Sequence, residues 1–109
     1  MTEPTFLLSS EASNDLLAIG NYIAQEGGHL RALSVIERIA RSLATIAYSP
    51  NIGRVRTDLD GSPNLFPVPP WIILYEPAQD LSSVLILRIY DGRRDLKNLL
   101  REYKRPRRS

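Results

Sequence analysis

Two adjacent arginines, Arg93 and Arg94, follow directly on a strongly apolar run of the chain. The run, Val84 to Tyr90, hardly alternates between apolar and polar residues, which predicts a strand buried on both faces. Asp91-Gly92 then predicts a turn. We therefore expect the two arginines to emerge at the end of a rigid element, point into water and present positive charge to a partner.

The composition excludes several kinds of chemistry. The chain has no cysteine, so it has no disulfide, no thiolate nucleophile and no cysteine-based zinc site. Its single histidine, His29, cannot build a metal site alone, and the preceding Gly27-Gly28 places it in a loop or at the start of a helix. We expect His29 to be exposed, and we expect neither a metal nor a cofactor.

The chain's 109 residues are enough for one domain with a modest core. Its hydrophobic content of 43% and charged content of 24% are typical of a folded, soluble protein. No apolar run approaches the ~18–20 residues that cross a bilayer, and the short run Phe6-Leu7-Leu8 after Glu3 makes a poor secretion signal. We therefore expect a cytoplasmic protein.

The net charge of +2 is concentrated at the C-terminal end. Residues 1–90 hold six Lys and Arg against nine Asp and Glu, whereas residues 91–109 hold eight against three. We expect residues 1–103 to form a single domain and residues 104–109 a basic tail. The tail either contacts phosphates or an acidic protein, or is a solvated segment that aids solubility, and we favour the second interpretation.

A strand and a helix are predicted at the N-terminal end. After a short strand from Thr5 to Leu8, Ser9 or Ser10 can cap a helix from Glu11 to about Gln25. Its apolar residues recur at helical spacing. They are Ala12, Leu16, Ile19 and Ile23, with Leu17 and Tyr22 widening the apolar face.

A second helix is predicted from about Leu30 to Ala47, closed by Pro50 and Gly53. Its apolar face keeps the same spacing and consists of Leu33, Ile36, Ile39 or Ala40, Leu43 and Ala47. Because Gly27-Gly28 leaves only a short connection, the two helices must form an antiparallel hairpin.

Beyond Pro50 the pattern changes toward the strand period of two. Residues 51–64 predict a loop, and Leu65 to Val68 a strand that Pro67 confines to a sheet edge, because proline lacks an amide donor. Trp71 to Tyr75 is a clearer strand.

A hairpin connection at residues 77–82 joins that strand to the buried run, and a last helix is predicted from about Arg94 to Tyr103. The order of the elements predicts an α+β fold. In it, an N-terminal strand and a helical hairpin combine with a small, mostly antiparallel sheet and a short C-terminal helix.

Four segments carry motifs in a recognisable order. They read SSEASNDLLAIGNYIAQ in the first helix, AYSPNIGRVRTDL after the second helix, WIILYEP in a strand and VLILRIYDGRRDL at the buried strand and its turn. Together they resemble the ParE/RelE superfamily of toxins from toxin–antitoxin pairs. The corresponding family features are an Ile-x-x-Tyr-Ile pattern, a Pro-x-x-Gly-x-x-Arg passage, a strand ending in Tyr and an arginine-bearing strand closed by Gly-x-Arg-Asp. The resemblance covers roughly residues 6–96.

Within the superfamily the chain is more similar to ParE than to RelE. RelE-like members cleave mRNA on the ribosome, which requires a base for the 2′-hydroxyl proton and positive charge on the middle strands. Here residues 65–74 are apolar and proline-rich, and Tyr90 is better interpreted as packed in its strand than as catalytic. We therefore expect no catalytic residue, although an enzymatic role stays open with the RelE alternative.

The resemblance implies the toxin component of a type II toxin–antitoxin system. Such a toxin inhibits DNA gyrase by binding and is neutralised by a cognate antitoxin whose wrapping segment is disordered alone. The alternatives are a RelE-like, ribosome-dependent mRNA endoribonuclease and a degenerate, non-toxic binding module. A homodimer and a toxin–antitoxin hetero-oligomer both stay open.

We expect five arginines to contact the target or the antitoxin: Arg88, Arg93 and Arg94 first, and Arg54 and Arg56 second. The alternative for Arg88 is an ion pair at the strand end with Asp91 or Asp95, and the alternative for the last two arginines is an ordinary solvated loop. The chain departs from the family at Asp91, where many ParE-like chains have histidine, and in its proline-rich residues 67–70. These departures leave a changed target or weakened toxicity open.

Overall fold

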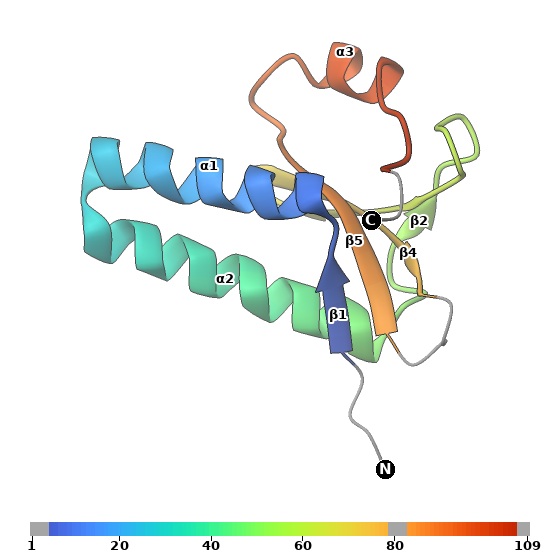
Figure 1. Ribbon diagram of the computed structural model, residues 1–109, viewed down its shortest axis with the longest axis horizontal. Helices are drawn as coiled ribbons and strands as arrows, with labels where there is room; N and C mark the ends of the chain where they lie inside the picture. The colour runs from blue at the N-terminus through green and yellow to red at the C-terminus, as the bar shows by residue number, and fades with distance from the viewer. Residues whose placement is uncertain (1–4, 79–82, 107–109) are drawn as a thin grey trace.

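The computed structural model, which describes residues 5–78 and 83–106, has an α+β fold (Figure 1). Five strands form one sheet in the order β1-β5-β4-β3-β2, in which β1 and β5 are parallel and the other pairs antiparallel. The strands are β1 Thr5–Leu8, β2 Arg54–Val55, β3 Asn64–Val68, β4 Trp71–Pro77 and β5 Ser83–Asp91. The helices are α1 Ser10–Gly27, α2 His29–Tyr48 and α3 Leu96–Arg101. The predicted fold class is confirmed.

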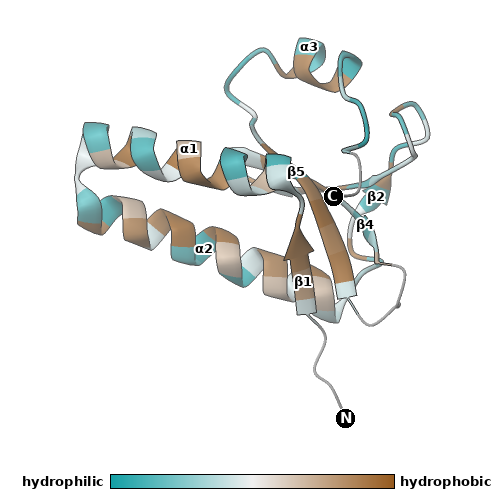
Figure 2. Ribbon diagram, in the orientation of Figure 1, coloured by the Kyte–Doolittle hydropathy of each residue, from teal (hydrophilic) through white to brown (hydrophobic). Residues whose placement is uncertain are grey.

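Strand β5 is a central strand of the sheet, with a neighbouring strand on each side. It pairs with β1 on one side, from Thr5 opposite Ser83 to Leu8 opposite Ile86, and with β4 on the other. None of its residues is exposed, which confirms the predicted burial on both faces. Figure 2 shows β5 as hydrophobic along most of its length.

The sheet separates two apolar cores. Between one face and the helical hairpin lie Ala12, Ile39, Leu43, Ile46, Ile73, Tyr75, Val84, Ile86 and Ile89, with further apolar residues around them. The opposite face, together with α3 and the segment after it, buries Leu59, Leu74, Leu87, Tyr90 and Tyr103. In Figure 1 the two long helices lie side by side, and α3 lies apart from them. Two covered faces explain why β5 lacks a polar side.

The helical hairpin matches the predicted one, with each helix slightly longer than expected. It reverses at Gly28, whose φ of 90° lies in the region that favours glycine. Part of the predicted apolar face is wrong: Leu17, Tyr22 and Leu33 are 64%, 58% and 59% exposed. Their apolar character predicts that they point inward, but the buried stripe on each helix is narrower than the set of apolar residues suggests.

The second half of the chain differs from prediction at several points. The segment expected to be a loop contains the two-residue strand β2, which takes the sheet edge in place of β3. Strand β2 pairs only with Asn64 and Leu65, so Pro67 still lies beyond the covered part of β3. The last helix is shorter than predicted. Residues 79–82 of the predicted hairpin connection lie outside the described residues.

Candidate functional site: a basic groove beside the central strand

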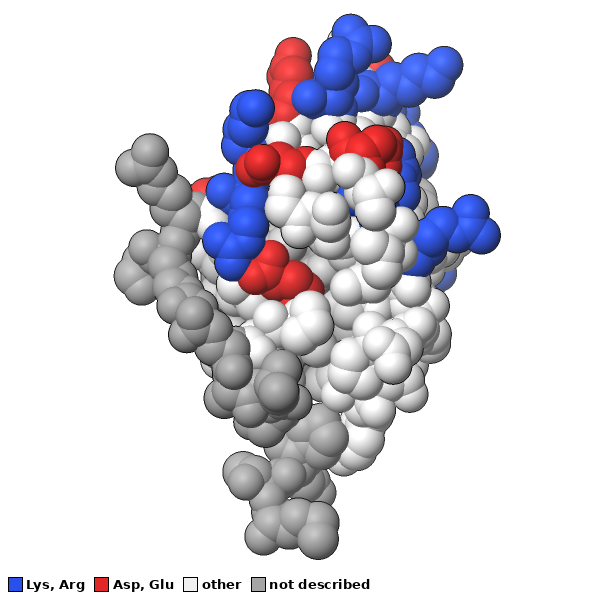
Figure 3. All heavy atoms as spheres, turned by 90° about the vertical axis from the view of Figure 1, so that its right-hand side faces the viewer, with Lys and Arg blue, Asp and Glu red and all other residues white. Residues whose placement is uncertain are grey.

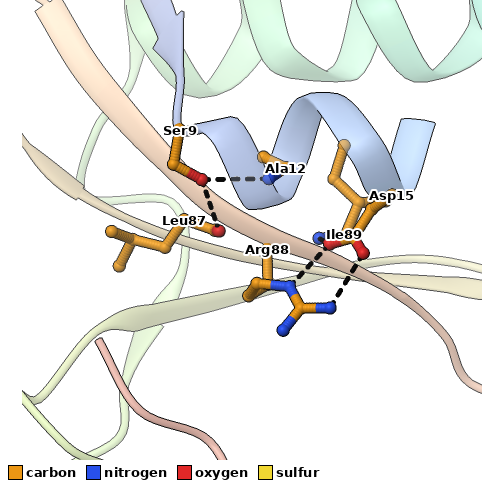
Figure 4. Close-up of polar contacts among 6 residues, drawn as sticks. All are labelled: Ser9, Ala12, Asp15, Leu87, Arg88 and Ile89. Carbon is orange, nitrogen blue, oxygen red and sulfur yellow. Dashed lines mark hydrogen bonds and ion pairs between the residues drawn. The ribbon is translucent and has the colours of Figure 1, made fainter. Parts of the chain in front are cut away.

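Arg88 on β5 is held by Asp15 on α1 (Figure 4). Its Nε and Nη2 donate to the two carboxylate oxygens of Asp15 at 2.7 and 2.8 Å, and Asp15 Oδ2 also accepts the backbone N–H of Ile89 at 2.9 Å. The hydrogen bonds that Arg88 donates to Asp15 raise the pKa of Arg88 above its usual range. The alternative that paired Arg88 with Asp91 or Asp95 is therefore wrong, since the carboxylate comes from the first helix.

Ser9 fixes the start of α1 against the same strand (Figure 4). Its hydroxyl donates to the carbonyl of Leu87 at 2.8 Å and accepts the N–H of Ala12 at 3.0 Å, which makes it the N-cap. Its backbone N–H donates to the carbonyl of Ile86 at 3.0 Å. These bonds place the next turns of α1, and with them Asp15, beside the C-terminal half of β5.

The turn after β5 carries the two predicted arginines. Asp91 Oδ1 accepts the backbone N–H of Arg93 at 2.9 Å and its Nε at 3.1 Å, while Asp91 Oδ2 accepts Nη2 at 3.0 Å. The Arg93 hydrogen bonds hold the pKa of Asp91 below its usual range. Arg94 is exposed, and within the described residues its guanidinium makes no hydrogen bond or ion pair.

Gly92 lets this turn approach Pro69-Pro70, the connection between β3 and β4, closely. Its N–H donates to the carbonyl oxygen of Pro70 at 2.7 Å, and a Cβ at this position would lie 2.8 Å from the same oxygen. Arg38 on α2 donates to the Pro69 carbonyl at 2.7 Å and lies 5.7 Å above the ring of Trp71. The proline-rich segment therefore joins the hairpin to the end of β5.

Two adjoining cavities lie along α1, and together we call them the α1–β5 groove. The larger, of about 710 Å³, includes Asp15, Arg88, Asp91, Arg93, Arg94 and Leu99 in its lining. The smaller, of about 440 Å³, extends toward the first turns of α2 and includes Glu26, Arg31 and Arg38. Both are lined by Tyr22, Ile23, Trp71 and Arg93. The part shared by the two cavities is therefore mainly apolar and aromatic, with Arg93 beside it and further arginines on either side.

The chemistry of the groove suits the binding of anionic groups. Its lining contains five arginines but three carboxylates, and Asp15 and Asp91 are already engaged by Arg88 and Arg93. Tyr90 also lines it, but burial raises the pKa of this phenol, which opposes its use as a base near neutral pH. The tyrosine packs in β5 with 5% exposure, and the Arg88 guanidinium lies 4.8 Å from its ring centre.

The structure brings together three of the five predicted site residues. Arg88, Arg93 and Arg94 all line the larger cavity. Arg54, on β2, and Arg56, just after it, line neither cavity, and Arg56 forms an ion pair with Asp58 at 2.7 Å. Figure 3, which views the molecule from the side of Figure 1 where β2 lies, shows basic and acidic side chains intermixed at its upper end.

The chain end packs on the domain at Arg105. The guanidinium of Arg105 pairs with Glu76 on β4, and its backbone N–H donates to Asp60 at 2.7 Å. Pro106 is buried as well. The favoured interpretation of a solvated tail is therefore wrong for these two residues, and residues 107–109 lie outside the described part of the chain.

Sequence reasoning missed several residues that shape the groove. Asp15 and Arg38 are not among the residues predicted to form a site. Tyr22 was predicted on the apolar face of a helix and Trp71 at the start of a strand, although aromatic residues are frequent anchors at binding surfaces. No signal along the chain links Asp15 to Arg88.

Two further properties concern the described residues alone. Within residues 5–78 and 83–106, no three His, Asp or Glu side chains gather where they could hold a metal ion. No helix in those ranges is long and apolar enough to cross a membrane. His29 begins α2 and is exposed, as expected.

Comparison with known proteins shows which proteins this chain is similar to. The family model described as ParE toxin of type II toxin-antitoxin system, parDE, matches residues 6–96. Toxin ParE3 of Caulobacter vibrioides (strain ATCC 19089 / CIP 103742 / CB 15) is 33% identical over 84 residues, which are 77% of this chain and 82% of the relative. A solved structure titled Chromosomal ParDE TA system from P. aeruginosa superposes with a TM-score of 0.67 at 19% identity, covering 82% of this chain and 95% of that one. The last likeness concerns the fold alone.

Proposed function

Because this chain belongs to the family of ParE toxins of type II toxin–antitoxin systems, we propose that it inhibits DNA gyrase by binding and is neutralised at the α1–β5 groove by its antitoxin. Membership of this family implies a cognate antitoxin as partner. Gyrase as the target, the groove as the antitoxin site and the cytoplasm as the compartment are parts of the proposal. The chain acts by binding and breaks no bond.

The observation that carries the proposal is the convergence of Arg88, Arg93 and Arg94 on one groove with an aromatic middle. Guanidinium groups bind carboxylates in a fixed, forked geometry, and aromatic side chains are frequent anchors at protein interfaces. An antitoxin segment with acidic residues beside an apolar anchor fits this arrangement. Arg54 and Arg56, which lie away from the groove, stay a second predicted contact.

Induced expression tests the function directly. The chain is expressed alone and together with the protein encoded by the neighbouring open reading frame, and growth, plasmid supercoiling and ribosome-bound mRNA are measured. We expect growth arrest with loss of negative supercoiling, relieved by the co-expressed protein. Cleaved mRNA with normal supercoiling would identify the ribonuclease alternative, and unaffected growth with soluble protein would identify the non-toxic one.

Two double variants test the site. Arg93→Ala with Arg94→Ala should keep the fold, because both side chains are exposed, but should weaken gyrase inhibition or antitoxin binding. Arg41→Ala with Arg101→Ala is the matched control, since it removes the same charge at exposed residues that line neither cavity. Full activity and full antitoxin affinity in the folded first variant would exclude the groove arginines from the function.

A further inference from the structure

The two arginines of the turn after β5 make different contacts, although they are adjacent in the sequence. Arg93 gives its backbone N–H, Nε and Nη2 to the carboxylate of Asp91. Arg94 gives only its backbone N–H, to the backbone carbonyl of Asp91 at 3.1 Å. Within the described residues, the guanidinium of Arg94 is left without a carboxylate. One arginine is therefore already occupied and the other is available.

This difference matters for any acidic partner that enters the groove. A carboxylate that approaches Arg93 must displace Asp91, which competes from within the same chain at a high effective concentration. Asp91 is also anchored, because it ends β5 and one of its oxygens is bound to the Arg93 amide. A carboxylate that approaches Arg94 displaces only water. Both arginines line the same cavity, so the same segment can reach either.

We propose that Arg94 is the guanidinium of this turn that binds an acidic residue of the antitoxin, and that Asp91 is a specificity-determining residue that keeps Arg93 out of that contact. This inference rests on the proposed function, because it takes the antitoxin as the partner. Asp91 acts as an internal substitute for the partner's carboxylate. The antitoxin therefore needs one acid aligned with Arg94 and gains nothing from a second acid aligned with Arg93.

A first experiment tests this division without the antitoxin. The Nε–H signals of the arginines are followed by NMR while poly-L-glutamate is added, with Arg93→Ala and Arg94→Ala used to assign the signals. In the unmodified chain the Arg94 signal should shift and the Arg93 signal should stay, whereas in Asp91→Asn both should shift. An equal response of the two arginines in the unmodified chain would overturn the inference.

A second experiment measures affinity for the antitoxin encoded beside this chain. Loss of one charge-assisted contact should weaken binding about tenfold in Arg94→Ala, but Arg93→Ala should change it less than about twofold. Arg41→Ala, on an exposed part of α2 outside both cavities, is the control for simple loss of charge and should also stay within about twofold.

The Asp91→Asn variant completes the test, because asparagine keeps an oxygen for the Arg93 amide but removes the charge. It should bind more tightly than the unmodified chain, and the gain should vanish in Asp91→Asn combined with Arg93→Ala. A gain that survives in the double variant, or equal losses in Arg93→Ala and Arg94→Ala, would overturn the inference while leaving the proposed function intact. Failure of the unmodified chain to bind the antitoxin would instead contradict the proposed function and with it the Arg94 contact. The polyglutamate titration would then decide only whether Asp91 keeps Arg93 from an added carboxylate.

Discussion

Asp15 and Arg88, 73 residues apart in the sequence, form a two-pronged ion pair that joins the first helix to the central strand. The same carboxylate also binds the backbone of β5 at Ile89. Only 15% of the Asp15 side chain and 30% of the Arg88 side chain are exposed, so water screens the pair incompletely. Arg88 is therefore first a structural residue, and only the remaining exposed part of its guanidinium is available for the proposed partner contact.

Asp15→Asn should destabilise the fold by about 2 kcal/mol, because it leaves a partly buried guanidinium without its charged partner. The measurement is the free energy of unfolding in urea. Asp58→Asn is the matched control, since its side chain is 62% exposed and its partner Arg56 lies only two positions away, and it should leave stability unchanged. Equal effects of the two substitutions would contradict a special role for the Asp15–Arg88 pair.

Two glycine-to-alanine substitutions should change the stability of the fold in opposite directions. Gly92→Ala should cost about 1–3 kcal/mol, because the new methyl group meets the Pro70 carbonyl at 2.8 Å. Gly20→Ala, inside α1, should instead stabilise the fold by about 0.5–1 kcal/mol, because its methyl group meets only Ile36 at an ordinary 3.5 Å. Thermal unfolding of both variants decides the point. A stable Gly92→Ala variant would show that the turn can move away from the proline segment.

Replacing two buried tyrosines with phenylalanine should change the stability of the fold in opposite directions. The Tyr75 hydroxyl donates to the Pro50 carbonyl at 2.7 Å and accepts the Gly53 N–H at 2.9 Å, so Tyr75→Phe should cost about 1–2 kcal/mol. The buried Tyr103 hydroxyl has no hydrogen-bond partner among the described residues, and Tyr103→Phe should stabilise the fold by about 1 kcal/mol. Urea unfolding measures both. Destabilisation by Tyr103→Phe would indicate that this hydroxyl is hydrogen-bonded in solution.

Acid should weaken the contact between Asp91 and Arg93. Since the folded chain holds the pKa of Asp91 below its usual value, the stabilisation is fully present above about pH 3.9 and is lost as the pH falls through the lower, folded-state value. Asp91→Asn lacks this contribution at every pH. The difference in unfolding free energy between the unmodified chain and this variant should therefore shrink from about pH 5 to about pH 2. A constant difference would assign the effect of the substitution to something other than the carboxylate charge.

The sequence predicted the elements whose signals are local. The first strand was placed at its observed bounds, and β5 was recognised from an apolar run that needs cover on both faces. Strand β2 was missed because two residues carry no periodicity, and it forms only because β3 lies beside it. Leu17 and Leu33 were placed inward because their type does not reveal how narrow the buried stripe of each helix is.

The groove could be predicted only in part, for a related reason. Arg93 and Arg94 follow a strand directly, so their exposure is evident from neighbouring residues. The sequence offers Asp91 and Asp95 as nearby partners for Arg88. The actual partner, Asp15, lies on α1 and is brought close only by the packing of the hairpin on the sheet. Contacts of this kind depend on the tertiary arrangement, which no local pattern encodes.

The central place of β5 has a consequence for the order of events during translation. The ribosome makes residues 83–91 after β1, the helical hairpin and β4, yet both β1 and β4 need them as a neighbour in the sheet. A growing chain that stops short of Arg88 has the residues of its helical hairpin but neither the arginine-bearing turn nor the Asp15–Arg88 ion pair. The sheet and the arginine-bearing turn are therefore completed together, once β5 has been made.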